Sequence, residues 1–298
     1  MSDSGQDSAL GFTIPSQNAR GRVVRLGPAL DEILAAHNYP PVIANLLAEA
    51  IVIAALLGST LKEAGGQLTL QAQTESGLID LLVADYRGGA MRGYVRHDRD
   101  KLAEAPESPS LFALFGQGYL AITFDQIATN ERYQGIVPLE GGSLSDAIEH
   151  YFVQSEQIPS LVRVETAMRE DGRMVAGGLL LQHLPEGEEG RERLHVRLNH
   201  PEWEHIRTLG ETVTGQELVD PGVEMKALLW RLFHDEEEIR TLTPIALAKG
   251  CRCDAEHIRQ VIAKFSAEER AEMADSEGII RVDCEFCARD FPVELADL

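Results

Sequence analysis

Two stretches near the start of the chain, residues 27–37 and 40–63, carry apolar side chains at spacings of three and four. This spacing predicts two helices that each turn a face towards a core. Just before them, the run RVVRL at residues 22–26 predicts a strand. The most apolar part of the second helix is interrupted by polar residues and is shorter than the ~20 residues that cross a bilayer. We therefore expect a buried helix and no membrane partner.

Short runs rich in β-forming residues follow the two helices and are separated by turn signals. The predicted strands are residues 67–73, 78–86, 90–95, 119–124, 161–169 and 173–182, with a further helix near 145–152. The first three strands predict a meander, and Asp171-Gly172 between the last two is a strong hairpin signal. The fold class predicted for this part of the chain is α+β with mainly antiparallel strands.

The pattern changes at Leu184-Pro185, where a polar run without apolar periodicity predicts a domain boundary. Further on, Asp220-Pro221 predicts a helix start, with Asp as the N-cap and Pro at the first helical position. The helix expected over residues 222–240 has one apolar stripe, made of Val223, Met225, Leu228, Leu229, Leu232 and Phe233. The stripe either packs on the first domain or binds a partner directly. The predicted units are an α+β core (1–187), a helical linker (188–243) and a small C-terminal zinc-binding domain (244–298).

Charge and composition narrow the class of protein. The 298-residue chain has 48 acidic and 27 basic residues, a formal net charge of −21, and 44% hydrophobic residues. Such a composition can bury a sizeable core. A phosphate backbone is bound through Lys and Arg, so the acidic excess argues against nucleic acid as a partner. The N-terminal segment has no basic region followed by an apolar run, and we expect a cytoplasmic protein.

All four cysteines lie near the C-terminus, as a C-x-C pair and a C-x-x-C pair separated by 30 residues. The pairs are Cys251 with Cys253 and Cys284 with Cys287. Four thiolates in two close pairs suit a closed tetrahedral Zn²⁺ site, and we expect one Zn²⁺ per chain in the reduced form. The module around them has few apolar residues, so its folding should depend on the metal.

Several functions fit a zinc–thiolate centre. A static zinc staple in a constitutive binding module remains open. A thiol–disulfide exchange enzyme is disfavoured because Asp283 and Glu285 place negative charge beside Cys284. A catalytic zinc needs an open ligand position, so we do not expect an enzyme. A nucleic-acid reader is disfavoured because residues 250–298 hold six basic and twelve acidic residues. A redox switch is favoured, since oxidation of the thiolates removes the ligands on which the module depends.

Motifs along most of the chain, from about residue 22 to residue 291, support a more specific reading. They are CRC (251–253), CEFC (284–287), HNYPP (37–41), GYV (93–95), YFVQSEQIP (151–159), AGGLLLQHLP (176–185) and RLFHD (231–235). With these motifs the chain resembles the redox-regulated molecular chaperone family of 33 kDa chaperonins, heat-shock protein 33.

The resemblance implies an ATP-independent holdase that is idle when reduced and zinc-bound and that binds unfolding client proteins under oxidative stress. It implies disulfides Cys251–Cys253 and Cys284–Cys287 on oxidation, release of zinc, and unfolding of tail and linker to expose client-binding surface. It also implies a homodimer of the activated form.

Other motifs carry weaker expectations. The G-x-G-x-x-A run at residues 116–121 precedes a strand, so we expect a turn and no nucleotide site. We expect surface or packing roles for His195, His200 and His205, with adventitious metal binding as the alternative, and no ligand role for His257. For Ser155-Glu156-Gln157 we expect capping or inter-strand hydrogen bonds.

Overall fold

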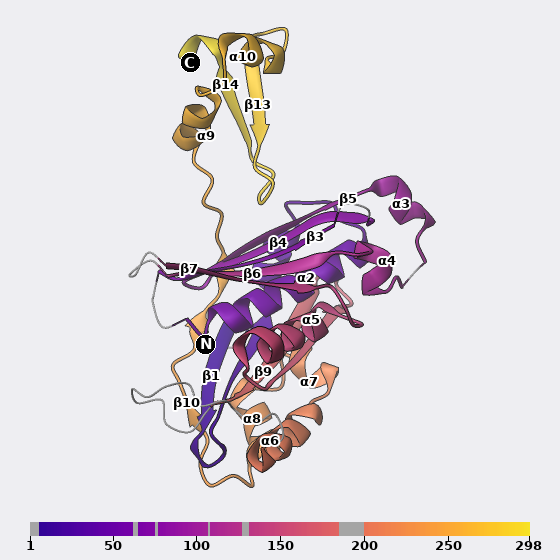
Figure 1. Ribbon diagram of the computed structural model, residues 1–298, viewed down its shortest axis with the longest axis vertical. Helices are drawn as coiled ribbons and strands as arrows, with labels where there is room; N and C mark the ends of the chain where they lie inside the picture. The colour runs from indigo at the N-terminus through magenta and orange to yellow at the C-terminus, as the bar shows by residue number, and fades with distance from the viewer. Residues whose placement is uncertain (1–5, 62–64, 75–76, 107, 127–130, 185–199) are drawn as a thin grey trace.

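The computed structural model describes residues 6–61, 65–74, 77–106, 108–126, 131–184 and 200–298. The described residues form two six-stranded sheets, a separate two-stranded sheet and several helices. Figure 1 shows the two large sheets stacked around one helix, with the two-stranded sheet and its helices at one end of the molecule. The mixed α and β class predicted from the sequence is confirmed.

The first sheet, called sheet A, has the order β10-β1-β2-β9-β8, and β11 pairs with β1. Its strands are β1 (Ser8–Ile14), β2 (Ala19–Leu26), β8 (Ser160–Met168), β9 (Met174–His183), β10 (Arg240–Thr241) and β11 (Ile245–Ala246). The predicted hairpin of β8 and β9 is confirmed: it is antiparallel, and Gly172 in its turn has a φ of 78°. Strand β1 was not predicted.

The second sheet, called sheet B, has the order β12-β5-β4-β3-β6-β7. Its strands are β3 (Gln67–Gln73), β4 (Ile79–Arg87), β5 (Ala90–His97), β6 (Tyr119–Gln126), β7 (Glu131–Pro138) and β12 (Ala248–Lys249). Strands β3, β4 and β5 are antiparallel neighbours, so the predicted meander is confirmed. Strand β7 was missed. Its first four residues are all exposed, so this half of the strand shows no alternation of buried and exposed positions.

Helix α2 (Pro41–Gly58) lies between the two sheets, after the short helix α1 (Pro28–Leu34). By length and composition α2 could cross a membrane, but 72% of it is buried inside the protein. Two glycines let it approach both sheets: a Cβ at Gly93 of β5 would lie 2.8 Å from Ile51, and one at Gly178 of β9 would lie 2.7 Å from Val52. Helix α2 is therefore the buried core helix that the sequence predicted.

Three helices cover the other face of sheet A: α6 (Pro201–Glu211), α7 (Gly215–Val219) and α8 (Met225–Phe233). Their apolar side chains form a second core with strands β1, β2, β8 and β9. The remaining helices border sheet B or its connection to β8: α3 (Arg99–Glu104), α4 (Leu111–Phe115) and α5 (Leu144–Tyr151), which continues into a π-helical turn at Phe152–Glu156.

The helix predicted over residues 222–240 is shorter than expected at both ends. It begins at Met225 with Glu224 as its N-cap, because Asp220 accepts a hydrogen bond from the backbone of Gly222 and so holds a separate turn. It ends at Phe233, and the chain beyond reaches sheet A as β10. Residues 234–237 form a turn and a bend in place of further helix, and only Arg240 of the predicted helix lies in a strand. The boundary predicted after residue 187 lies outside the described residues.

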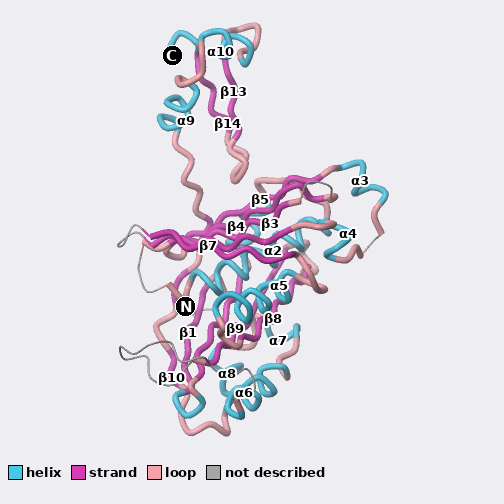
Figure 2. The backbone as a smooth tube through the Cα atoms, in the orientation of Figure 1, coloured by secondary structure: helices cyan, strands magenta, loops and turns pink. Residues whose placement is uncertain are grey.

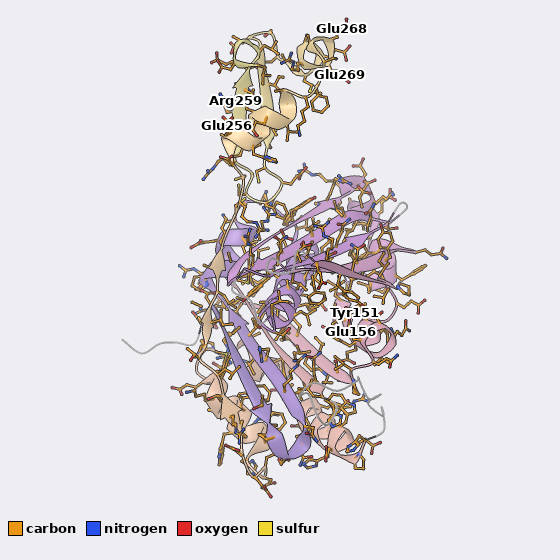
Figure 3. The ribbon with its side chains drawn as sticks, turned by 60° about the vertical axis from the view of Figure 1, so that its left-hand side comes forward. Tyr151, Glu156, Glu256, Arg259, Glu268 and Glu269 are labelled. Carbon is orange, nitrogen blue, oxygen red and sulfur yellow. The ribbon has the colours of Figure 1, made fainter. Side chains whose placement is uncertain are left out.

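The C-terminal module extends away from both large sheets (Figure 2). It contains α9 (Ala255–Ile262), α10 (Ala267–Met273), β13 (Ile279–Asp283) and β14 (Asp290–Glu294). The sequence predicts a helix cap at Asp254 and a capping box from Ser266 to Glu269, and both are confirmed. Asp254 accepts a hydrogen bond from the His257 backbone, and Ser266 forms a capping box with Glu269. Charged side chains of both helices, labelled in Figure 3, are exposed. The buried centre consists of Ile262, Ile280 and Val293, a very small core for a folded unit.

Candidate metal centre and its docking surface

The two cysteine pairs meet where the module joins the rest of the protein. Cys251 and Cys253 directly follow β12, and Cys284 and Cys287 lie in the turn between β13 and β14. Two bound cysteines at positions i and i+2 require a turn at Cys251, and the sequence predicts that Gly250 supplies the freedom for it. Gly250 serves close packing instead, because a Cβ at this position would lie 2.5 Å from the Cβ of Ala90 on β5.

The four sulfur atoms surround one point. The Sγ of Cys251 lies 3.4 Å from that of Cys253 and 3.6 Å from that of Cys284, and the Sγ atoms of Cys253 and Cys287 are 3.6 Å apart. All four lie within 4.8 Å of one another. With Zn–S bonds of about 2.3 Å, the edge of a tetrahedral site is about 3.8 Å. Free thiols at these separations fit one tetrahedral ion, and the donor set is the one that zinc prefers.

The pKa values show how the sulfurs act on one another. Burial alone raises the pKa of the Cys251 thiol, but hydrogen bonds from the Cys253 backbone and the neighbouring thiols outweigh it and lower the pKa to about 7. Burial and the neighbouring thiols raise the pKa of Cys253 to about 12. One thiolate therefore opposes ionisation of the others, and a divalent cation would be needed for all four to be thiolates.

Arg252, the residue between the first two cysteines, attaches its loop to sheet B. Its guanidinium lies 3.0 Å from the carboxylate of Asp85 on β4, whose side chain is only 3% exposed. The same carboxylate pairs with Arg92 of β5 at 2.7 Å and accepts a hydrogen bond from the Thr69 hydroxyl. A buried carboxylate with these partners is a fixed anchor for the first cysteine loop.

Phe286, inside the second cysteine pair, attaches the other loop to β5. Its ring meets Tyr94 edge-on with centroids 4.9 Å apart, and the Arg92 guanidinium lies 3.8 Å above it. The backbone carbonyl of Phe286 also accepts a hydrogen bond from the imidazole of His37, the first residue of the HNYPP motif. The first cysteine loop therefore docks on β4 through Arg252, and the second docks on β5 through Phe286.

Sequence reasoning missed this docking surface. It gave Arg252 no role, it counted Phe286 only among the few apolar residues of the zinc module, and it passed over Asp85 as one residue of a predicted strand. A carboxylate flanked on both sides by apolar residues of a strand was the available signal, because a buried charge needs a partner.

A segment called the strap, residues 240–250, connects the docking surface to both sheets. It pairs with β1 through β10 and β11, and with β5 through β12. Backbone hydrogen bonds join Leu242 to Gly11, Leu247 to Asp7 and Gly250 to Met91, each 2.8 Å long. The strap therefore connects the first cysteine loop to the edges of both sheet A and sheet B.

The apolar stripe of α8 is buried against sheet A. Met225, Leu228, Leu229, Leu232 and Phe233 are buried, and Val223 is partly buried beside them. Packing on the first domain, one of the two expected roles, is therefore observed. The sequence also predicts that the zinc module beyond Pro244 covers this stripe in the resting state. This prediction is wrong, since the module and α8 lie at opposite ends of the molecule (Figure 1). Sheet A provides the cover instead, because its face is apolar over the whole length of α8.

Arg25 of β2 adds a polar anchor that the sequence did not reveal. It is 1% exposed, and its guanidinium donates to the carbonyl oxygens of Glu217, Leu218 and Val223. These bonds hold the turn between α7 and α8 on sheet A.

The weaker motifs have structural roles where they are described. Gly116, with a φ of 58°, ends α4 before strand β6, so the G-x-G-x-x-A run is a turn as predicted. Glu156 accepts a hydrogen bond from Tyr151 at 2.7 Å, and Figure 3 labels both. His205 pairs with Glu236, while His257 is not among the clustered metal-binding groups of the described residues. His195 lies outside the described residues.

Comparison with known proteins places the chain in a family. The family model described as "Hsp33 protein" matches residues 7–294. A 33 kDa chaperonin of Caulobacter vibrioides is 41% identical, with 97% of this chain and 95% of that protein covered. One of Photorhabdus laumondii is 33% identical, with 98% and 95% covered. The crystal structure of a Thermotoga maritima 33 kDa chaperonin shares the fold, with a TM-score of 0.77 at 22% identity over 98% of this chain and 96% of that one. The chain thus belongs to the Hsp33 family of chaperones, in agreement with the resemblance seen in its motifs.

Proposed function

We propose that this chain is a cytoplasmic, ATP-independent holdase chaperone, idle when reduced and zinc-bound and activated by oxidation of its four cysteines. The observation that carries the proposal is the convergence of four sulfurs in a module that has almost no core of its own. Cys251, Cys253, Cys284 and Cys287 would hold one Zn²⁺. When bound, the metal supplies about 10–16 kcal/mol of apparent binding energy, which holds the module folded.

Oxidation would remove the ligand set in two steps for each disulfide. One thiolate attacks a peroxide oxygen and gives a sulfenic acid and hydroxide. A second thiolate then attacks the sulfenic sulfur and releases a second hydroxide. Each disulfide thus consumes one hydrogen peroxide and, after uptake of two protons, yields two waters. Two such reactions convert all four thiolates, and the module is left without ligands for a cation.

Loss of the folded module would act on the linker through the strap. Without the cysteine loops, the Asp85 and Tyr94 docking contacts disappear, and β12 loses its attachment at the edge of sheet B. The strap and then α8 would leave sheet A and expose the apolar stripe to unfolding clients. The net charge of −21 opposes self-aggregation of this surface. The activated form is proposed to be a homodimer.

We expect oxidation to give mainly Cys251–Cys253 and Cys284–Cys287 disulfides. Distance alone does not select the pairs, because the sulfur of Cys251 is almost as close to that of Cys284 as to that of Cys253. Bonds within each pair close the shortest loops of the chain, and short loops close fastest. Peptide mapping of peroxide-treated protein by mass spectrometry, with zinc release followed on the same sample, measures the pairing. A majority of disulfides between the first pair and the second would contradict this expectation.

We expect amides of α8 to lose hydrogen-exchange protection on oxidation, while those of α2 keep theirs. Helix α8 is held only on the outer face of sheet A, whereas α2 lies between both sheets. The measurement compares exchange in reduced and oxidised protein, alongside suppression of the aggregation of an unfolding client. If suppression switches on while Met225–Phe233 stays equally protected, client binding occurs elsewhere and the exposure mechanism is wrong.

The same assays separate the rival functions. A constitutive binding module with a static zinc site would suppress aggregation equally before and after peroxide or hypochlorite treatment. A thiol–disulfide exchange enzyme would reduce insulin disulfides with turnover, whereas the proposed holdase would only keep the insulin chains from aggregating.

A further inference from the structure

A second group of side chains that could bind a metal lies on sheet A and α6, whereas the cysteines dock on sheet B. His183 is the last residue of β9, His200 is the N-cap of α6, and Glu202 lies in the first turn of α6. The group therefore bridges sheet A and the first of the helices that cover it. One ligand atom from each residue lies within 4.8 Å of the others, as in the cysteine group.

The distances within this group suit a shared cation. The Nε2 atom of His183 is 3.4 Å and the Nδ1 atom of His200 is 3.6 Å from the same carboxylate oxygen, Oε2 of Glu202. The contact between His183 and Glu202 is a long hydrogen bond, since charge-assisted hydrogen bonds are about 2.7–2.9 Å long. In contrast, Zn–N and Zn–O bonds of about 2.0–2.1 Å give tetrahedral edges of about 3.3 Å. Both separations are close to the span of ligands around one ion.

The surroundings would hold the three ligands in place. The amide of Asn18, in the turn after β1, donates to Oε2 of Glu202 at 3.1 Å and orients the carboxylate. The His183 side chain is only 4% exposed, and the centroid of the Trp203 ring lies 6.4 Å from that of its imidazole. The side chains of Glu202 and His200 are 30% and 36% exposed, which leaves an approach for a hydrated ion. Metal ligands fixed by hydrogen bonds of this kind are typical of built sites.

We propose that His183, His200 and Glu202 form a second divalent-cation site, which takes Zn²⁺ through two imidazole nitrogens and one carboxylate oxygen. Imidazole and carboxylate together suit zinc, and three protein ligands leave the fourth position to water. A cation here ties the end of β9 to the start of α6, so it favours the arrangement in which α6 lies on sheet A. The site uses no cysteine and does not depend on the redox proposal.

The test is a calorimetric titration of full-length, reduced protein, already loaded with one zinc per chain, with further Zn²⁺. The expected result is a second equivalent bound per chain. Removal of one ligand, in His200→Ala or in Glu202→Gln, should weaken this second binding at least 100-fold. Asn18→Ala removes only the group that orients the carboxylate, so it should weaken binding by about 10–100-fold.

His205→Ala is the matched control, because His205 also lies on α6 but pairs with Glu236 outside the group. It should leave the second equivalent unchanged. Far-UV circular dichroism shows whether each variant keeps its fold, and the cysteine-bound zinc, measured on the same samples, should remain at one per chain. Uptake of no second equivalent by the parent protein, or equal uptake by folded His200→Ala and Glu202→Gln, would overturn the proposal without affecting the cysteine centre.

Discussion

Replacement of one cysteine, as in Cys284→Ser, is expected to abolish tight zinc binding and to unfold residues 251–298. The serine hydroxyl is a poor zinc ligand, so the variant keeps only three of the four sulfur ligands. Among the described residues, the group contains no further His, Cys, Asp or Glu that could replace the lost one. The module then loses most of about 10–16 kcal/mol of apparent stabilisation. Its core of Ile262, Ile280 and Val293 is too small to replace this energy by burial.

Two measurements check this expectation. Metal analysis after dialysis against a weak chelator should fall from about one zinc per chain to near zero, and hydrogen exchange should show loss of protection in α9 and β13. Amides of α2 in the main core should stay protected. His257→Ala is the control, since His257 is a nearby histidine outside the sulfur group, and it should retain the metal. Equal zinc content and affinity in Cys284→Ser and the parent would rule out the four-cysteine site.

Asp85→Asn is expected to release the cysteine loops from sheet B while the thiols are still reduced. The carboxylate is buried and serves both Arg252 and Arg92, so its neutralisation leaves two guanidinium groups without their counter-charge. Breaking such a buried pair costs about 3–5 kcal/mol. We expect the variant to suppress client aggregation without oxidant, because the strap loses its anchor at β12 although the zinc site is intact.

A second variant separates docking from the stability of sheet B. Arg252→Met removes the contact from the module side and leaves the Asp85–Arg92 pair in place. It should show the same direction of change, with faster amide exchange in residues 240–250 and unchanged zinc content. Arg281→Met is the matched control, because Arg281 pairs with Asp275 and Asp290 inside the module. If both docking variants stay idle and keep the strap protected, docking does not control activation.

Local sequence signals predicted much of the framework. The apolar period identified α2 as a buried helix, and Asp171-Gly172 identified the β8–β9 hairpin. Short-range hydrogen bonds explain the confirmed caps at Asp254 and Ser266, since a cap needs only its own first turn. The N-cap predicted at Asp220 was wrong, although its hydrogen bond is also local. The Asp220 carboxylate accepts a hydrogen bond from the Gly222 backbone, and the helix begins only at Met225.

The missed elements depend on partners far along the chain. Strand β1 is stabilised by pairing with β2, β10 and β11, and the last two of these strands come from the C-terminal part of the sequence. The predicted helix ends at Phe233 in a turn, and the chain pairs with β1 only from Arg240 onwards. The predicted contact between the zinc module and the apolar stripe of α8 was wrong. An apolar stripe indicates that another surface buries it, but it does not indicate whether that surface is sheet A or the module.

The sequence by itself determined the α+β class, the family, the core helix and the two cysteine pairs, because each rests on residue type and on spacing within a few positions. Only the tertiary structure decided which surfaces meet. Arg252 and Asp85 are 167 positions apart, and His183 and Glu202 come from two different elements. The partner of a buried charge or of a metal ligand is set by how the sheets and helices pack, and that packing is a property of the whole chain.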